Sequence, residues 1–158
     1  MKKIFLFLAT AALAVTMNSC SSDDNSDSNG GSGAIGGTIT AKINGVSKTF
    51  DNVVVNQETF TEDGGYTILT ITGTMGTSTN ELFKFDVEKG DVGADAVYSY
   101  SIEYKSAGST YGAYNQQFTT VVQTNSDNKL KGNFSGILNS SNGETTVNFA
   151  DGAFNIAY

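Results

Sequence analysis

The sequence has no histidine, no tryptophan and no arginine, and it has a single cysteine. Histidine is the usual general base at neutral pH and the commonest metal ligand, so its absence removes both roles. Without histidine or a second cysteine, structural zinc sites and the Ser-His and Cys-His nucleophile pairs are excluded. The nine basic residues are all lysines, against sixteen acidic residues, which gives a net charge of −7. Nucleic-acid binding needs a basic patch, so no nucleic-acid partner is expected.

The chain begins with two lysines followed by a short apolar segment. Residues 1–17 read MKKIFLFLATAALAVTM, and the apolar run extends from Ile4 to Val15. A membrane-spanning helix needs about 20 apolar residues. This shorter run predicts a secretory signal peptide over residues 1–19. Its removal takes away Lys2 and Lys3 and no acid, which changes the net charge from −7 to about −9.

The single cysteine, Cys20, follows this segment directly, in the sequence MNSC. MNSC resembles the lipobox of bacterial lipoproteins, with Met17 at the position where leucine is usual. The resemblance implies cleavage before Cys20, a diacylglycerol thioether on its sulfur and an acyl group such as palmitate on its new amino group. Two or more lipid chains anchor a protein stably, at ~0.8 kcal/mol per buried CH₂. We therefore expect lipidation of Cys20, with the membrane as a partner.

Residues 20–36 are predicted to be a flexible tether. The segment SSDDNSDSNGGSG has no apolar residue and is rich in serine, aspartate, asparagine and glycine, so it cannot bury enough surface to order itself. A linker of about 14 residues reaches roughly 20 Å. Ser22–Asn25 also resembles the acidic tether of surface-exported lipoproteins in Bacteroidota-type bacteria, which implies an outer-membrane protein that faces outward. A plain solvated spacer is the alternative.

Residues 37–158 read as one all-β domain. Short alternating runs separated by turn residues recur along the whole segment. Asn44-Gly45 predicts a tight hairpin turn, because a type I′ turn needs positive φ at both positions, and Asp151-Gly152 predicts a second one. In the run 81–88, Phe83, Phe85 and Val87 share one face and Lys84, Asp86 and Glu88 share the other, as in a half-buried strand. We expect about nine strands in a single antiparallel β-sandwich or an up-and-down, calycin-like barrel.

Five stretches of this domain also carry a family resemblance: ING, LTITGT, FKFDVEKGDVGADAVYSY, LKGNFSG and GETTVNFADGAFNIAY. Their order over residues 38–158 resembles a group of small uncharacterised Bacteroidota lipoproteins. These motifs are turns and core alternation, so the resemblance implies a fold and a location. It implies no activity and no site residue.

Acidic residues give no convincing catalytic or metal site. Glu62-Asp63, and Asp91 with Asp95, could hold calcium between loops, but ordinary turn chemistry explains them as well. Asp86 and Glu88 lie two apart on one strand, about 6.7 Å along the chain, which is the spacing of an inverting glycosidase pair. They share their face with a lysine and are therefore interpreted as a solvated face. We expect no catalytic residue, no metal and no cofactor.

The tyrosines form the candidate ligand-binding group. Tyr98, Tyr100 and Tyr104 are predicted to line one face of a strand over residues 97–104, and Tyr111 and Tyr114 follow across a glycine-rich loop. Core packing with hydroxyls at the rim is one interpretation. The other is an exposed aromatic patch that stacks on a sugar or docks a partner.

Together these features predict a non-enzymatic, lipid-anchored lipoprotein of the outer membrane, surface-exposed, with a structural or binding role in the cell envelope. Its partners would be the membrane, through Cys20, and a glycan or an envelope protein. Two alternatives stay open. One is a surface glycan-binding accessory lipoprotein, and the other is a calycin-like carrier of a small apolar ligand.

Overall fold

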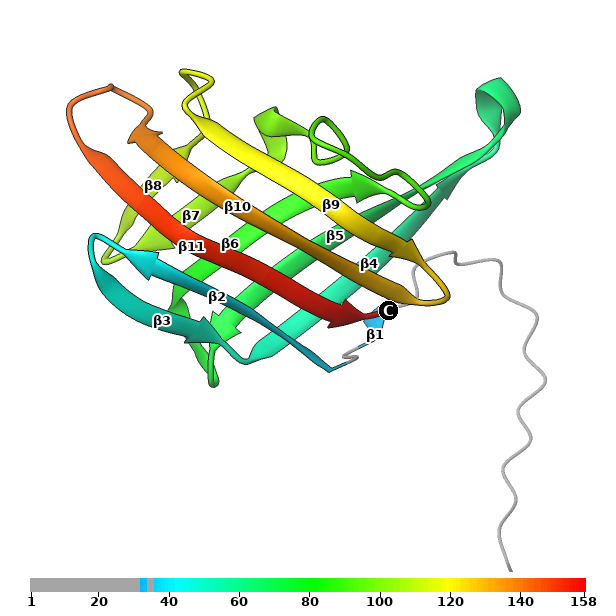
Figure 1. Ribbon diagram of the computed structural model, residues 1–158, viewed down its shortest axis with the longest axis horizontal. Helices are drawn as coiled ribbons and strands as arrows, with labels where there is room; N and C mark the ends of the chain where they lie inside the picture. The colour runs from blue at the N-terminus through cyan, green and yellow to red at the C-terminus, as the bar shows by residue number, and fades with distance from the viewer. Residues whose placement is uncertain (1–31, 34–35) are drawn as a thin grey trace, which may run out of the picture.

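The computed structural model describes residues 32–33 and 36–158 (Figure 1). The predicted signal peptide, Cys20 and most of the predicted tether lie outside the described residues. In the described part of the chain, no helix has the length and apolar character needed to cross a membrane. The strands are β1 (Ser32–Gly33), β2 (Gly37–Ile43), β3 (Val46–Phe50), β4 (Asn52–Phe60), β5 (Tyr66–Met75), β6 (Ser78–Glu88), β7 (Glu103–Ser106), β8 (Ser109–Gly112), β9 (Phe118–Ser126), β10 (Lys129–Ser140) and β11 (Thr146–Ala157), and the 3₁₀ helices are η1 (Glu62–Gly64) and η2 (Ser99–Ser101).

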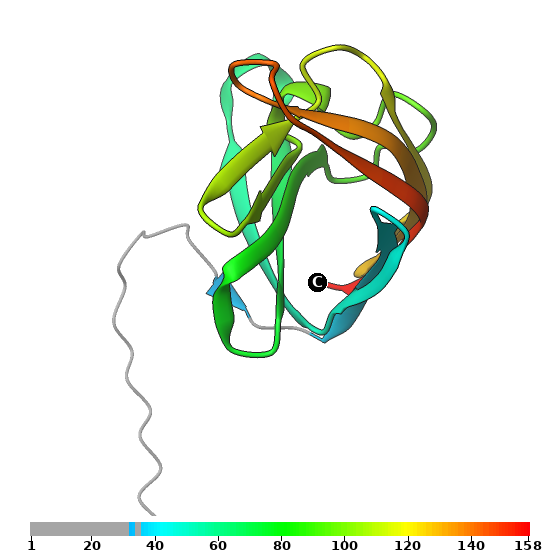
Figure 2. The ribbon, with the colours of Figure 1, turned by 90° about the vertical axis from the view of Figure 1, so that its left-hand side faces the viewer.

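These strands form one antiparallel sheet that curls into a nearly closed barrel (Figure 2). Nine strands follow one another around it in the order β4-β5-β6-β7-β8-β10-β11-β2-β3. The short β1 adds to the outer edge of β4, and β9 pairs with β10 beside the shorter β8. The all-β, antiparallel prediction is confirmed, and of the two architectures expected the structure is the barrel.

The two predicted tight turns have different outcomes. Asn44 and Gly45 join β2 to β3 with φ values of 48° and 82°, which confirms the hairpin. The turn predicted at Asp151-Gly152 is wrong, because β11 runs through both residues. They form a β-bulge, at which the pairing of β11 with β2 shifts register. Bulges accept the same positive φ that turns need, and Asp151 has a φ of 52°.

Phenylalanine side chains fill the barrel interior. The ring of Phe83 lies at the centre, with centroids 4.9 Å from Phe134, 5.5 Å from Phe149 and 5.9 Å from Phe85. Burial of each such side chain contributes about 1.5–3 kcal/mol, so this cluster holds the fold without a disulfide. The buried phenylalanines, each 7% exposed or less, are Phe50, Phe83, Phe85, Phe118, Phe134, Phe149 and Phe154.

Alternate residues from Phe154 to Tyr158 are part of this core. Phe154, Ile156 and Tyr158 are 3%, 1% and 4% exposed. The backbone N–H of Tyr158 donates to the carbonyl oxygen of Asn128 at 2.9 Å, and its hydroxyl donates to Oδ1 of Asn125 at 2.9 Å. The last residue therefore ties β11 to β9 and to the β9–β10 turn.

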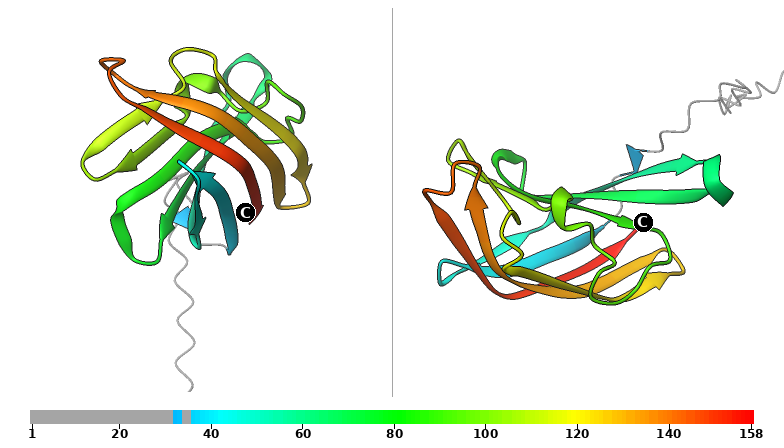
Figure 3. Two further views of the ribbon diagram at one scale, coloured as in Figure 1. Left: turned by 60° about the vertical axis from the view of Figure 1, so that its left-hand side comes forward. Right: turned by 90° about the horizontal axis from the view of Figure 1, so that it is seen from above.

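One hairpin extends past the barrel. The ends of β4 and β5 project with η1 at their tip (Figure 3). The rings of Phe60 and Tyr66 stack there with centroids 4.9 Å apart, and the hydroxyls of Thr59 and Thr67 lie 3.0 Å apart. These cross-strand pairs stabilise a two-stranded arm, which lies apart from the site described next.

Candidate functional site

The sequence pattern predicts one strand over residues 97–104, and this prediction is wrong. The chain forms η2 instead, and β7 begins only at Glu103. The hydroxyl of Ser101 accepts a hydrogen bond from the backbone N–H of Asp86 at 2.8 Å and donates to the carbonyl oxygen of Tyr98 at 2.7 Å. A side chain thus occupies the edge of β6 where a paired strand would otherwise lie.

As a result, the five candidate tyrosines lie in three places instead of on one face. The rings of Tyr98 and Tyr100 stack, with centroids 5.4 Å apart and planes 11° apart. Tyr104 is only 2% exposed and belongs to the core, with the ring of Tyr111 6.0 Å away. Tyr114 is 61% exposed and lies outside both pairs. The structure therefore brings Tyr98 and Tyr100 together and separates them from the other three.

Tyr98 and Tyr100 line a surface groove of about 690 Å³, which we call the tyrosine groove. Its other side is the beginning of β9, with Thr119 and Val121. This strand begins at the same end of the barrel as η2 (Figure 1). Tyr100 is 83% exposed although one face of its ring rests on Tyr98. The other face is therefore free to stack on a ligand.

The lining of the groove is almost uncharged. Asp95 is the one charged residue among the residues that line it, and Gln116 adds an amide. Burial and the nearby Glu88 carboxylate raise the pKa of Tyr98, whose hydroxyl lies 3.4 Å from Oε2 of Glu88. The Tyr98 hydroxyl is thus protonated at neutral pH. A neutral or positively charged ligand fits this lining better than an anion does.

A second polar cluster closes one end of the barrel. Glu81 on β6 accepts hydrogen bonds from Nζ of Lys48 on β3 and from the hydroxyl of Tyr104 on β7. Burial lowers the pKa of Lys48, but Glu81 and Tyr104 outweigh it and raise the pKa overall. Burial and Glu81 raise the pKa of Tyr104. The three groups satisfy one another and join three strands, which is a structural role.

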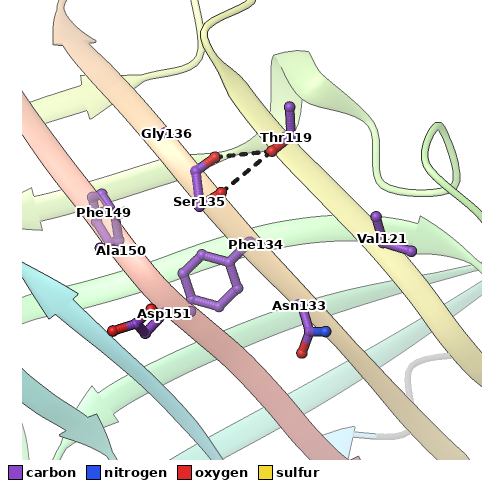
Figure 4. A pocket seen from close by; sticks show the side chains of 10 residues that line it. Thr119, Val121, Asn133, Phe134, Ser135, Gly136, Phe149, Ala150 and Asp151 are labelled. Carbon is purple, nitrogen blue, oxygen red and sulfur yellow. Dashed lines mark hydrogen bonds between the residues drawn. The ribbon is translucent and has the colours of Figure 1, made fainter.

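A shallow hollow of about 660 Å³ lies on the outer face of β9, β10 and β11 (Figure 4). Three of its polar side chains, Thr119, Ser135 and Asp151, already have partners. The hydroxyl of Thr119 donates to the carbonyl oxygen of Ser135 at 3.2 Å, and Asp151 pairs with Lys42 at 2.8 Å. Gly152 at the bulge also lines the hollow, and Phe134 occupies the space that a Cβ on Gly152 would take. No group of three or more acidic side chains that could hold a metal occurs within residues 32–33 and 36–158.

Comparison with models of protein families, with curated proteins and with solved structures finds no match to this chain. The tyrosine groove therefore has to be interpreted from its own geometry. Sequence reasoning identified Tyr98 and Tyr100 but not their neighbours Gln116, Thr119 and Val121. The two groups of residues come together because the loop after β6 pairs with β9. No local pattern in the sequence shows that pairing.

Proposed function

We propose that this chain is a lipid-anchored, non-enzymatic binding protein of the bacterial outer membrane, and that its ligand binds in the tyrosine groove. The observation that carries the binding function is the stacked Tyr98–Tyr100 pair, because Tyr100 is 83% exposed at the wall of a groove. Aromatic rings that lie together at the surface are typical of interaction sites. The anchor rests on the sequence around Cys20.

The interior of the barrel is a less suitable site. The buried phenylalanines occupy it, and Phe83 contacts them on several sides at ring distances of 4.9 to 6.3 Å. A calycin-like carrier would need space there for its ligand. The packing therefore favours a ligand site on the surface, and the exposed ring admits two classes of ligand, a glycan or a segment of an envelope protein.

The anchor is tested with Cys20→Ala. Membrane fractions of cells that produce the full chain should lose the protein, because without the thioether and the acylated amine no lipid holds it. Retention of the variant in the membrane fraction would contradict the anchor. That outcome would leave the groove unaffected.

The groove is tested by thermal unfolding of the purified full chain against glycans, peptides and envelope extracts. A ligand at 100 times its Kd adds about 2.7 kcal/mol to the free energy of unfolding, which is several degrees in Tm for a domain of this size. Tyr100→Ala should abolish the shift without changing the unliganded Tm. Tyr114→Ala is the matched control, because that exposed tyrosine does not line the groove. Equal shifts in both variants would contradict the site.

A further inference from the structure

The floor of the tyrosine groove includes a free edge of β9, and two sets of backbone bonds show which residues form it. The carbonyl oxygen of Gln117 accepts from the N–H of Ile137 at 2.9 Å, so odd-numbered residues here face β10. Val122 exchanges both its backbone bonds with Gly93, at 2.8 and 2.9 Å, so even-numbered residues face away from β10. The pairing with β10 is regular from Phe118 to Val122. The N–H and C=O of Thr120 therefore point to the free edge.

These edge groups lack partners. Among residues 32–33 and 36–158, no hydrogen bond engages the backbone N–H or C=O of Thr120, although the residue is only 8% exposed. Phe118 has the same orientation and is 7% exposed. Buried backbone donors and acceptors are almost always paired. The loop pairs with β9 only at Gly93 and then turns away, which leaves the edge open where it lines the groove.

We propose that an extended peptide segment with a lysine or arginine binds here by adding a short strand to β9. One residue of such a segment offers a backbone C=O to the N–H of Thr120 and a backbone N–H to its C=O. The peptide residue two positions further along pairs with Phe118 in the same way. The Gly93–Val122 bridge at one end and the positive φ of Gln116, 53°, at the other limit the added strand to a few residues.

The preference for a basic residue comes from charge. Asp95 is the charged residue in the groove lining, and the chain as a whole has a net charge of −7. A guanidinium or ammonium group above the free face of Tyr100 gains a cation–π contact, and the same group attracts the Asp95 carboxylate. This inference rests on the proposed binding function and names its partner: an exposed basic segment of another envelope protein.

The test uses the purified full chain in detergent and the capped pentapeptide Ac-Val-Thr-Arg-Thr-Val-NH₂, with binding followed by NMR. Without peptide, the amides of Phe118 and Thr120 should exchange quickly with solvent, whereas those of Thr119 and Val121 should be protected by β10. Peptide should slow exchange at Phe118 and Thr120. N-methylation of alternate peptide residues should weaken binding tenfold or more in one register and leave it unchanged in the other, because only every second amide faces β9.

Thr120→Pro removes the free N–H and should weaken peptide binding about tenfold, since a proline is tolerated where the N–H faces away from the sheet. Thr120→Val keeps the N–H and the side-chain volume and should bind normally. Replacement of the peptide's arginine by glutamate should weaken binding to a similar degree. If Thr120→Pro fails to fold, the N-methylated peptides and the glutamate peptide still test the proposal, because both are measured on the unchanged protein.

Three outcomes would overturn the inference: no binding of the peptide, binding that is indifferent to the methylated register, or equal binding of the arginine and glutamate peptides. Cellotetraose is the neutral glycan arm of the experiment. If it binds in a Tyr100-dependent manner and the peptide does not, strand addition is wrong. The proposed binding function then stands with a glycan ligand.

Discussion

Asn125, near the end of β9, connects three parts of the barrel through one buried amide. It is 3% exposed. Its Nδ2 donates to the carbonyl oxygens of Glu88 at 2.7 Å and Asp91 at 3.0 Å, which fixes the loop that follows β6. Its Oδ1 accepts from the hydroxyl of Tyr158 at 2.9 Å. We therefore expect Asn125→Ala to destabilise the whole barrel.

The magnitude follows from these three hydrogen bonds. Each contributes about 1 kcal/mol net, so their loss costs roughly 3 kcal/mol. The Tyr158 hydroxyl would remain buried without a partner, and such a group can cost about 1–3 kcal/mol, whereas the carbonyl oxygen of Glu88 still accepts from the N–H of Asp91 at 3.1 Å. A loss of about 3–4 kcal/mol is a large part of the roughly 5–15 kcal/mol that holds a domain together. For a domain of this size it lowers the Tm by about 10 °C or more.

The assay is urea unfolding of the full chain followed by far-UV circular dichroism. Tyr158→Phe removes only the third bond and should cost about 1 kcal/mol. Gln123→Ala removes an exposed side chain of the same strand and should stay within about 0.5 kcal/mol of the parent. A loss below about 1 kcal/mol for Asn125→Ala would refute the reasoning, because the loop would then be held by other contacts.

Two further predictions concern the polar cluster of Lys48, Glu81 and Tyr104 and the glycines of the sheet and its turns. Burial and Glu81 raise the pKa of Tyr104, so above pH ~10 the unfolded chain loses this proton first and stability falls with rising pH. Tyr104→Phe should make that fall shallower in urea midpoints taken between about pH 8 and 11, and an unchanged slope would contradict it. Gly136→Ala should prevent folding, because its Cβ would lie 2.0 Å from the carbonyl oxygen of Gln117 at a φ of 132°. Gly143→Ala, with a φ of 74° and open space around it, should lower the free energy of unfolding by only about 1 kcal/mol.

Local chemistry made much of the barrel predictable. Asn44-Gly45 needs no tertiary context to form its turn, and it does so. The alternation of Phe83, Phe85 and Val87 with charged residues identifies the inner face of β6, and all three are 2% exposed or less. These signals succeed because a strand with one buried face has only one register that hides its apolar side chains.

The wrong predictions share a different cause. At each of these positions the structure depends on a contact with residues distant in sequence. Asp151-Gly152 has turn chemistry, but the neighbouring strands on both sides extend past it and make it a bulge. The stretch 97–104 alternates like a strand, but the Ser101 hydroxyl takes the Asp86 N–H that a strand would need. The segment 105–113, the glycine-rich loop between Tyr104 and Tyr114 in the sequence prediction, contains most of the β7–β8 hairpin, with Ala107 at a φ of 50° where glycine or asparagine is usual. The tyrosine groove was unpredictable for the same reason.

The groove lies far from the end of the barrel at which the chain enters β2. After β1 the chain passes through Gly36 into β2, and the carbonyl oxygen of Gly36 accepts from the N–H of Ala157 at 3.0 Å, beside the β9–β10 turn to which Tyr158 is bonded. The groove lies along the beginning of β9, and Thr120 is six residues, roughly 20 Å, from the last residue of that strand. The entry point and the groove are therefore at opposite ends of β9. If Cys20 is lipidated as we propose, its tether reaches the barrel at the end of β9 that is remote from the groove, so the anchor would not cover the groove.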